Sequence, residues 1–372
     1  MSILPENLLL PQRTIAGAGS IFKLSELIAG FGAKGIIVHG KSLERSGVLN
    51  SLVSSSANSE HIATYCHDGG EPTVEQVDAL RKDIINRKTN WMAAIGGGSV
   101  IDLTKAAAGL ACHSEPTAFY QANPSKIRNA RIPVIAAPTT AGTGSEATVV
   151  SVLTNTKKEL KQSIRHPSHM PKAVILDPQL LAGCPPSTIA AAGLDAFVQA
   201  FESYTSRYAV PFTKALAECA IGKIATHLLP FFNNPADNAA AAEMLEASYI
   251  TGMAFSHSRL GVIHGLAHPL GSRFRVAHGL VCACCLPASL EYNREYIQEH
   301  LEVLKSHLGI DIIELVDNWM AAMKLDNPFT GKEISDMDTF IKETLGSGST
   351  KANPREVTDE DVKWFVKRIC AN

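Results

Sequence analysis

Short apolar runs alternate with helical stretches through the first half of this chain of 372 residues, and the alternation then stops. Strands that alternate with helices indicate a mostly parallel sheet covered by helices. Four short apolar runs read as buried strands: residues 35–39, 91–95, 132–137 and 173–176. Helical periodicity lies between them, at residues 74–87 and 100–111.

The second half of the chain favours helices instead. Stretches rich in alanine, leucine and glutamate, which have high helix propensity, follow Pro185: residues 188–204, 213–229, 239–256 and 294–307. The chain is longer than one core comfortably fills. We therefore expect an α/β domain over residues 1–178 and an all-α domain over 179–372, joined near Asp177-Pro178. Residues 327–359, rich in glycine, serine, threonine and proline, should contain surface loops between the last helices.

Composition excludes several classes of partner. Hydrophobic residues at 45% and charged residues at 19% are typical of an ordinary folded protein. A net charge of -2 gives no electrostatic footprint for nucleic acid or an anionic membrane. No uninterrupted apolar run is long enough to span a bilayer, and residues 1–13 lack a signal-peptide pattern. We expect a cytoplasmic protein.

The eight cysteines suit a reducing compartment better than a disulfide framework. Three of them, Cys282, Cys284 and Cys285, fall close together in the apolar run from Leu280 to Leu286. No second CxxC accompanies them, so we interpret them as small buried helix residues and keep metal binding by them as the minor alternative.

Two pairs of polar residues with a spacing of four indicate a metal or catalytic site. On a helix, Asp195 with Gln199, and His264 with His268, would each project from one face. His278 follows fourteen residues after His264. Two such helices facing each other could hold a divalent metal through oxygen and nitrogen ligands.

Two loops that follow predicted strands indicate nucleotide binding. Gly96-Gly97-Gly98-Ser99 precedes a predicted helix, whose N-terminal amides and dipole favour a phosphate, although the turn is not GxGxxG. The second loop, residues 138–146, offers hydroxyls and amides for ribose, phosphate or carboxamide groups. At the same end of a parallel sheet, the two loops would form the walls of a nucleotide cleft.

Four motifs together resemble the iron-containing (group III) alcohol dehydrogenases. They are the glycine turn with Asp102, the loop Pro138-Thr-Thr-Ala-Gly-Thr-Gly-Ser-Glu146, the segment from Gly193 to Tyr204, and His264-Gly-Leu-Ala-His-Pro-Leu-Gly271 with Ala277-His-Gly279. The resemblance covers nearly the whole chain in the expected order. It implies a dinucleotide-binding α/β domain, an all-helical metal-binding domain and a cleft between them.

The resemblance also implies roles for individual residues. It implies a nicotinamide cofactor, NAD(P), bound by Gly40, Gly96, Gly97, Gly98, Ser99, Asp102, Thr139, Thr140, Thr143 and Lys161. It implies one divalent metal, Fe(II) or Zn(II), with Asp195, Gln199, His264 and His278 in the ligand positions. His268 would lie near the reacting alcohol and relay its proton, because its pKa is intrinsically near neutral. The metal would act as a Lewis acid on the substrate oxygen.

Two positions depart from the family pattern. Position 199 usually holds histidine there, and an amide oxygen is a weaker ligand, so the identity of the ion and the part played by Gln199 stay open. Members that prefer NAD usually place an acidic residue near position 40, whereas here Gly40 is followed by Lys41. The loop resembles that of NADP-using relatives, and an incidental surface lysine is the alternative.

Arg275, between two of the histidines, is the one clue to the substrate. An arginine there could pair with a carboxylate, phosphonate or sulfonate, although a solvated arginine has equal weight. We expect a dehydrogenase or reductase for a small, anionic alcohol or aldehyde. The alternatives are oxidation of the terminal hydroxyl of 3-deoxy-manno-octulosonate, a dehydroquinate synthase-like lyase, and a non-catalytic relative with a decaying metal site. A homodimer is left open.

Overall fold

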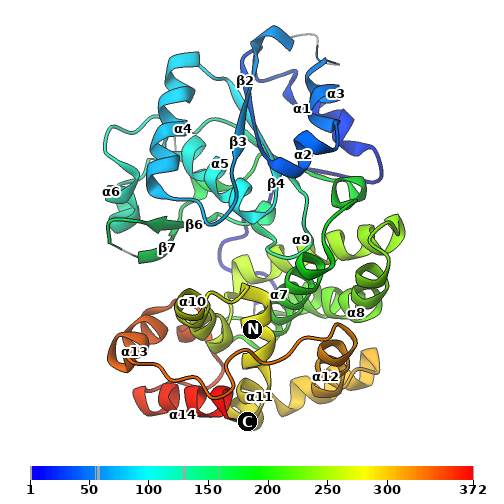
Figure 1. The fold of residues 1–372 in the computed structure, drawn as a ribbon, viewed down its shortest axis with the longest axis vertical. Helices are drawn as coiled ribbons and strands as arrows, with labels where there is room; N and C mark the ends of the chain where they lie inside the picture. The colour runs from blue at the N-terminus through cyan, green and yellow to red at the C-terminus, as the bar shows by residue number, and fades with distance from the viewer. Residues whose placement is uncertain (1, 55, 57–58, 129–130, 159, 372) are drawn as a thin grey trace. The chain divides into compact units, whose positions relative to one another are not determined.

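The computed structural model describes residues 2–54, 56, 59–128, 131–158 and 160–371. The chain forms two compact units. One comprises Leu9–Ala182, and the other comprises Met1–Leu8 together with Gly183–Asn372. Figure 1 shows a sheet with helices on both faces in the first unit and helices alone in the second.

The sheet of the first unit contains six strands in the order β1-β8-β5-β4-β2-β3, and every pairing is parallel. The strands are β1 (Arg13–Ala16), β2 (Gly35–Gly40), β3 (Ile62–His67), β4 (Trp91–Gly96), β5 (Val134–Pro138) and β8 (Ala173–Leu176). The four predicted strands are confirmed as β2, β4, β5 and β8. A separate antiparallel pair, β6 (Val150–Asn155) and β7 (Leu160–Arg165), was not expected.

Alternate residues of the strands enter two different cores, because successive side chains in a strand point to opposite faces. Ile36 and Met92 pack in the core under α4 and α5, whereas Ile37 and Trp91 pack in the core under the first helices. The helices of this unit are α1 (Leu24–Ile28), α2 (Lys41–Arg45), α3 (Val48–Ser54), α4 (Val74–Arg87), α5 (Gly98–Leu110) and α6 (Thr117–Ala122). Both predicted helices, now α4 and α5, are confirmed.

The second unit is built around α7, which packs against α8, α9 and α11. Its helices are α7 (Pro186–Thr205), α8 (Pro211–Asn233), α9 (Asn238–Ser258), α10 (Val262–Phe274), α11 (His278–Leu308), α12 (Ile312–Ala322), α13 (Met337–Gly346) and α14 (Asp359–Cys370). The first three predicted helices are confirmed, and the fourth is part of the much longer α11. The segment expected to hold loops also contains α13.

A close backbone approach fixes α11 against α7. A Cβ atom at Gly279 would lie 1.7 Å from the backbone oxygen of Ala191 in α7, so only glycine fits there. Asp195 lies one helical turn beyond Ala191, and His278 immediately precedes Gly279. The contact therefore brings the first residue of α11 beside the polar face of α7.

Helix α8 is, in the described part of the chain, the one helix long and apolar enough to cross a membrane by length and composition alone. It carries Lys214, Glu218 and Lys223 along its length. It also packs against α7 and α9, as a helix of a folded bundle does. Length and composition are therefore weak evidence for a membrane span here.

Candidate active site: a metal-ligand cluster and a glycine turn

Three helices bring four possible metal ligands together in the helical unit. Asp195 comes from α7, His264 from α10, and His278 and Cys282 from α11. One donor atom of each lies within 4.8 Å of the others. His264 Nε2 lies 3.3 Å from Asp195 Oδ1, and His278 Nε2 lies 3.8 Å from the same oxygen. The expectation that the i, i+4 pairs lie on helices that face each other is confirmed.

Glu202 fixes the orientation of His264. His264 Nδ1 donates to Glu202 Oε2 at 2.6 Å, and Glu202 Oε1 accepts from the Ile263 amide at 2.7 Å. With Nδ1 bound to Glu202, Nε2 is the ring nitrogen that faces Asp195 at the centre of the cluster. A carboxylate behind a histidine is the usual outer partner of a metal-binding imidazole.

Charge and burial act in opposite directions on the pKa values of the cluster. Burial alone would raise the pKa of Asp195, but His278 and His264 outweigh it and lower that pKa. Asp195 is therefore held as a carboxylate inside the protein. Burial raises the pKa of the Cys282 thiol to about 11, so a nearby cation would be needed to ionise it.

Two further predicted residues lie beside the cluster. Gln199, one turn after Asp195, hydrogen-bonds to that carboxylate, and its own Oε1 is buried with no partner among the described residues. His268 is half-buried and stacks on His278, with the ring centroids 4.9 Å apart. The stacking places His268 one side chain away from the donor atoms.

The glycine turn and the loop of residues 138–146, here called the threonine loop, lie against each other in the α/β unit. They follow β4 and β5, which are adjacent strands, and the Thr139 amide donates to the Gly96 carbonyl at 3.0 Å. A Cβ atom at Gly98 would lie 2.7 Å from the Thr143 side chain. Gly97 caps α5 without any side-chain hydrogen bond, and the first amides of a helix have no acceptor within it. The predicted pairing of the two loops at one sheet edge is confirmed.

Other predicted cofactor residues surround this turn. Gly40 ends β2, the neighbour of β4, and begins α2, so it lies at the same edge of the sheet as the turn. Ser99, Thr139 and Thr140 are half-buried, and Thr143 is exposed. Lys41, which follows Gly40, pairs with Asp68 at 3.1 Å, and both side chains are exposed.

Both carboxylate oxygens of Asp102 already have partners within the protein. Its Oδ1 accepts from the Ser145 hydroxyl, its Oδ2 accepts from the Val152 amide at 2.8 Å, and Lys105 Nζ lies 3.3 Å away. Lys105 is fully buried and also donates to the backbone and side chain of Ser145. In this structure Asp102 therefore anchors the threonine loop to α5.

Lys161 is not among the residues that meet at the glycine turn, and Arg275 is not among those of the metal-ligand cluster. Lys161 is in β7, where its ammonium group pairs with Glu71 at 2.8 Å. Arg275 follows the last residue of α10, where its backbone has the left-handed conformation, and its side chain is exposed. Among the described residues it has no ionic partner. Its neighbour Arg273 differs, because Asp336 and Glu343 both bind its guanidinium group.

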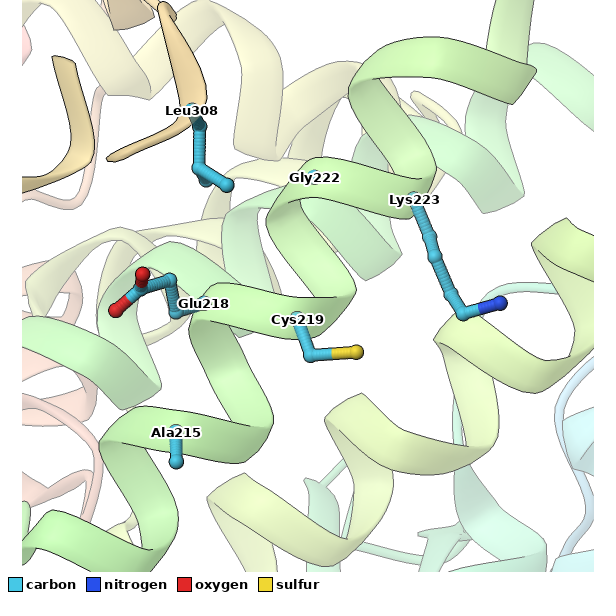
Figure 2. A pocket seen from close by; sticks show the side chains of 6 residues that line it. All are labelled: Ala215, Glu218, Cys219, Gly222, Lys223 and Leu308. Carbon is cyan, nitrogen blue, oxygen red and sulfur yellow. The ribbon is translucent and has the colours of Figure 1, made fainter. Parts of the chain in front are cut away.

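A surface hollow of about 400 Å³ on the helical unit holds none of the predicted residues. Its lining residues come from α8, apart from Leu308 in α11 (Figure 2). Lys223 pairs with Glu243 and Glu246, and Glu218 pairs with His307. The hollow therefore offers little uncommitted charge, and we assign no chemistry to it.

Sequence reasoning missed Glu202, which lies behind His264, and kept Cys282 only as a minor alternative. Glu202 lies seven residues after Asp195, so the same helical face that carries Asp195 and Gln199 also carries Glu202. Cys282 lies four residues after His278, on the same face of α11. The interpretation of the three cysteines as small buried helix residues is confirmed for Cys282 and Cys285, whereas Cys284 is half-buried, and the minor alternative of metal binding applies to Cys282.

Comparisons with known proteins match most of the chain to one family. The family model for iron-containing alcohol dehydrogenase matches residues 11–178, and the model for the C-terminal part of the same family matches residues 189–370. The probable alcohol dehydrogenase EutG of Escherichia coli is 35% identical over 95% of this chain and 91% of its own length. Lactaldehyde reductase of Escherichia coli is 30% identical over 93% of this chain and 94% of its own.

A solved structure shows the same fold. Sulfoacetaldehyde reductase from Bifidobacterium kashiwanohense, in complex with NAD+, superposes with a TM-score of 0.92 at 25% identity and covers 100% of both chains. The two family matches, supported by the relatives and the shared fold, identify the family. The chain belongs to the iron-containing alcohol dehydrogenase family and is an oxidoreductase.

Proposed function

We propose that this protein is a metal-dependent, NAD(P)-linked alcohol dehydrogenase or aldehyde reductase whose substrate is a small anionic molecule. The observation that carries the proposal is the cluster of Asp195, His264 and His278, with Glu202 behind His264. The family supplies the reaction class, and the side chains of this chain supply the substrate class.

The residues present fit a divalent ion. The cluster offers an ionised carboxylate and two imidazoles, and the buried Gln199 Oε1 lacks a hydrogen-bond donor. Asp195, His264 and His278 would hold the ion, with Gln199 as the fourth candidate. An ion bound there supplies Lewis-acid polarisation of the substrate oxygen. Neighbouring side chains orient the ligands: Glu202 orients His264, and Gln199 orients Asp195.

The edge of the sheet around Gly96–Ser99 fits a dinucleotide. Gly97 leaves room for a diphosphate to approach the start of α5, whose amides and dipole favour anions. Thr139, Thr140 and Thr143 offer hydroxyls beside the turn, and Gly40 lies at the end of the neighbouring strand. NAD+ in the sulfoacetaldehyde reductase complex supports a nicotinamide cofactor. Since Asp68 already pairs with Lys41, that lysine alone does not decide between NAD and NADP.

His268 is the proposed proton carrier. Its ring stacks on His278 and is half-buried, so one face meets the metal-ligand cluster while solvent reaches the ring. An imidazole can accept a proton on one ring nitrogen and release one from the other. In reduction of an aldehyde, the proton would pass through His268 to the product oxygen.

Arg275 is the proposed substrate anchor. Its guanidinium group is exposed and has no ionic partner among the described residues, unlike that of Arg273. A guanidinium group binds carboxylate, phosphonate and sulfonate groups through paired hydrogen bonds. The similarity to sulfoacetaldehyde reductase supports an anionic aldehyde, whereas the similarity to lactaldehyde reductase supports a neutral one.

The test measures kcat/KM from the absorbance of reduced nicotinamide with sulfoacetaldehyde, phosphonoacetaldehyde and lactaldehyde. We expect Arg275→Ala to lower kcat/KM for the two anions roughly ten- to hundredfold, the loss of one charge-assisted pair, and to leave lactaldehyde unchanged. Arg294→Ala, an exposed arginine of α11, is the matched control. Equal kcat/KM values for wild type and Arg275→Ala on every substrate would refute the anionic class.

The same assay separates the competing functions. Oxidation of 3-deoxy-manno-octulosonate would reduce NAD(P) with that sugar acid. A dehydroquinate synthase-like lyase would produce no net change in the cofactor, because it regenerates the cofactor in each turnover. A non-catalytic relative would bind the nucleotide without turnover of any substrate.

A further inference from the structure

Cys282 lies near Nε2 of His264, whereas Glu202 binds Nδ1 of the same ring. Cys282 is fully buried on α11, one helical turn after His278, so both side chains leave the same face of the helix. Its Sγ lies 3.8 Å from Asp195 Oδ1 and 3.9 Å from His264 Nε2. Each of these is a ligand atom of the site proposed above.

The separations match a tetrahedral site that is slightly open. In a tetrahedral site, zinc bonds of about 2.0 Å to nitrogen or oxygen set those ligand atoms roughly 3.3 Å apart. A zinc bond of about 2.3 Å to sulfur sets the sulfur roughly 3.5 Å from the others. The observed values are 3.3 and 3.8 Å among the oxygen and nitrogen atoms, and 3.8 and 3.9 Å to sulfur. Shifts of a few tenths of an ångström would bring these four separations to tetrahedral values, and all the ligand atoms lie within 4.8 Å of one another.

Two side chains compete for the fourth position. Gln199 has an unpartnered oxygen, but its amide is already hydrogen-bonded to the Asp195 carboxylate and so acts on another ligand. A thiolate is an anion and a much stronger ligand for a soft or borderline ion than a neutral amide oxygen. On binding, the thiol proton would pass to solvent and the sulfur electron pair to the metal.

We infer that Cys282, and not Gln199, is the fourth protein ligand, in an Asp195–His264–His278–Cys282 set that favours zinc over iron. The inference rests on the proposed metal site and specifies its ligands. Thiolate ligands shift selectivity toward zinc, whereas oxygen and imidazole ligands alone accommodate iron.

Cobalt(II) is the probe, because it replaces zinc and reports sulfur ligation by colour. The full-length protein is stripped with chelator and titrated with Co(II), and bound metal is counted by mass spectrometry. We expect one cobalt per chain and a thiolate-to-cobalt charge-transfer band in the near ultraviolet. Cys282→Ser should abolish the band and lower zinc affinity at least tenfold relative to iron.

Matched controls lie on the same helices. Cys284→Ser and Cys285→Ser remove neighbouring thiols of α11, and Gln199→Ala removes the competing ligand. All three should keep the charge-transfer band. If the band persists in Cys282→Ser, or disappears in Cys285→Ser, the assignment to Cys282 is wrong.

The unmutated protein provides a second readout in case Cys282→Ser does not fold. X-ray absorption at the zinc edge should show one sulfur at about 2.3 Å together with nitrogen or oxygen ligands. One bound metal per chain without a sulfur signal overturns the inference and leaves the proposed function standing. No stoichiometric binding of cobalt or zinc overturns both.

Discussion

Glu202 shows how one residue outside the ligand set controls it. Its two oxygens hold His264 Nδ1 and the Ile263 amide, so it fixes both the ring of His264 and the start of α10. Removing its charge leaves the imidazole with a weaker partner and a less defined tautomer. The ligands themselves would all still be present.

We therefore expect Glu202→Gln to weaken metal binding roughly ten- to hundredfold, the usual effect of losing such an outer partner. Competition with a chelator of known affinity measures it. Glu218→Gln, which alters a carboxylate on α8 that pairs only with His307 among the described residues, should bind metal as the wild type does. Equal affinities for wild type and Glu202→Gln would show that Glu202 does not orient His264.

Glu146 makes stability depend on pH. Burial raises the pKa of Glu146 to about 7, against the usual 4.5, although the nearby Lys105 acts in the opposite direction. Between these values the folded chain keeps a proton that the unfolded chain releases. Stability from this group is therefore complete below about pH 4.5 and is lost as the pH rises toward 7.

Glu146→Gln removes this dependence because an amide carries no proton to lose. At about 1.4 kcal/mol per pKa unit, the variant should gain roughly 3 kcal/mol relative to wild type between pH 5 and pH 8. Thermal unfolding at both values measures the difference, and Glu115→Gln, an exposed carboxylate of the same unit, is the control. A constant difference between variant and wild type would mean that Glu146 titrates normally.

At the scale of elements, the start of α5 is where the proposed dinucleotide site depends most on one backbone position. Gly97 has φ −72° and ψ −177°, which any residue adopts, and a Cβ atom there would lie 3.4 Å from the Thr140 side chain. The fold therefore tolerates alanine at 97. A methyl group would still obstruct the close approach of a diphosphate to the helix.

We predict that Gly97→Ala raises the Kd for NADH or NADPH at least tenfold and leaves the melting temperature nearly unchanged. Calorimetric titration and thermal unfolding give the two values. Gly30→Ala, in the same unit and with open space around the added methyl group, should change neither. An unaltered Kd would place the diphosphate elsewhere.

The elements that sequence could predict are those with a strong local signal. The buried strands β2, β4, β5 and β8 are continuous apolar runs. Strand β7 is mostly polar and pairs with β6, so its residues carry no such pattern. Helix α13 was missed because its surroundings are rich in turn-forming residues. The cysteines of residues 280–286 were expected to be helical, and so were residues 294–307, but not as one continuous helix. Gly279 and Pro287 weaken the helical signal, although tertiary packing against Ala191 requires the glycine.

The candidate site was predictable where its spacing is local. Asp195, His264 and His278 stand in motifs, but the meeting of Cys282 with Asp195 joins positions 87 residues apart. The same holds for Asp102, whose burial beneath Ser145 depends on the packing of a distant loop. Long-range contacts of this kind leave no periodicity in a sequence.

At the scale of the whole molecule, the two proposed sites belong to different units. The glycine turn lies in the unit Leu9–Ala182, and the metal-ligand cluster lies in the unit that contains Gly183–Asn372. The first unit ends at Ala182, close to the expected boundary at 178, and residues 1–8 group with the helices. The proposed reaction needs both units, since one would bind the nicotinamide nucleotide and the other the metal.

The most direct measurement is turnover against bound metal. The protein is stripped with chelator, verified metal-free, and reloaded in steps with Fe(II) or Zn(II), while oxidation of reduced nicotinamide by an aldehyde is followed by absorbance. We predict that turnover rises in proportion to bound metal and reaches its maximum at one ion per chain. Full turnover by the metal-free protein would contradict a metal-dependent reaction at this cluster.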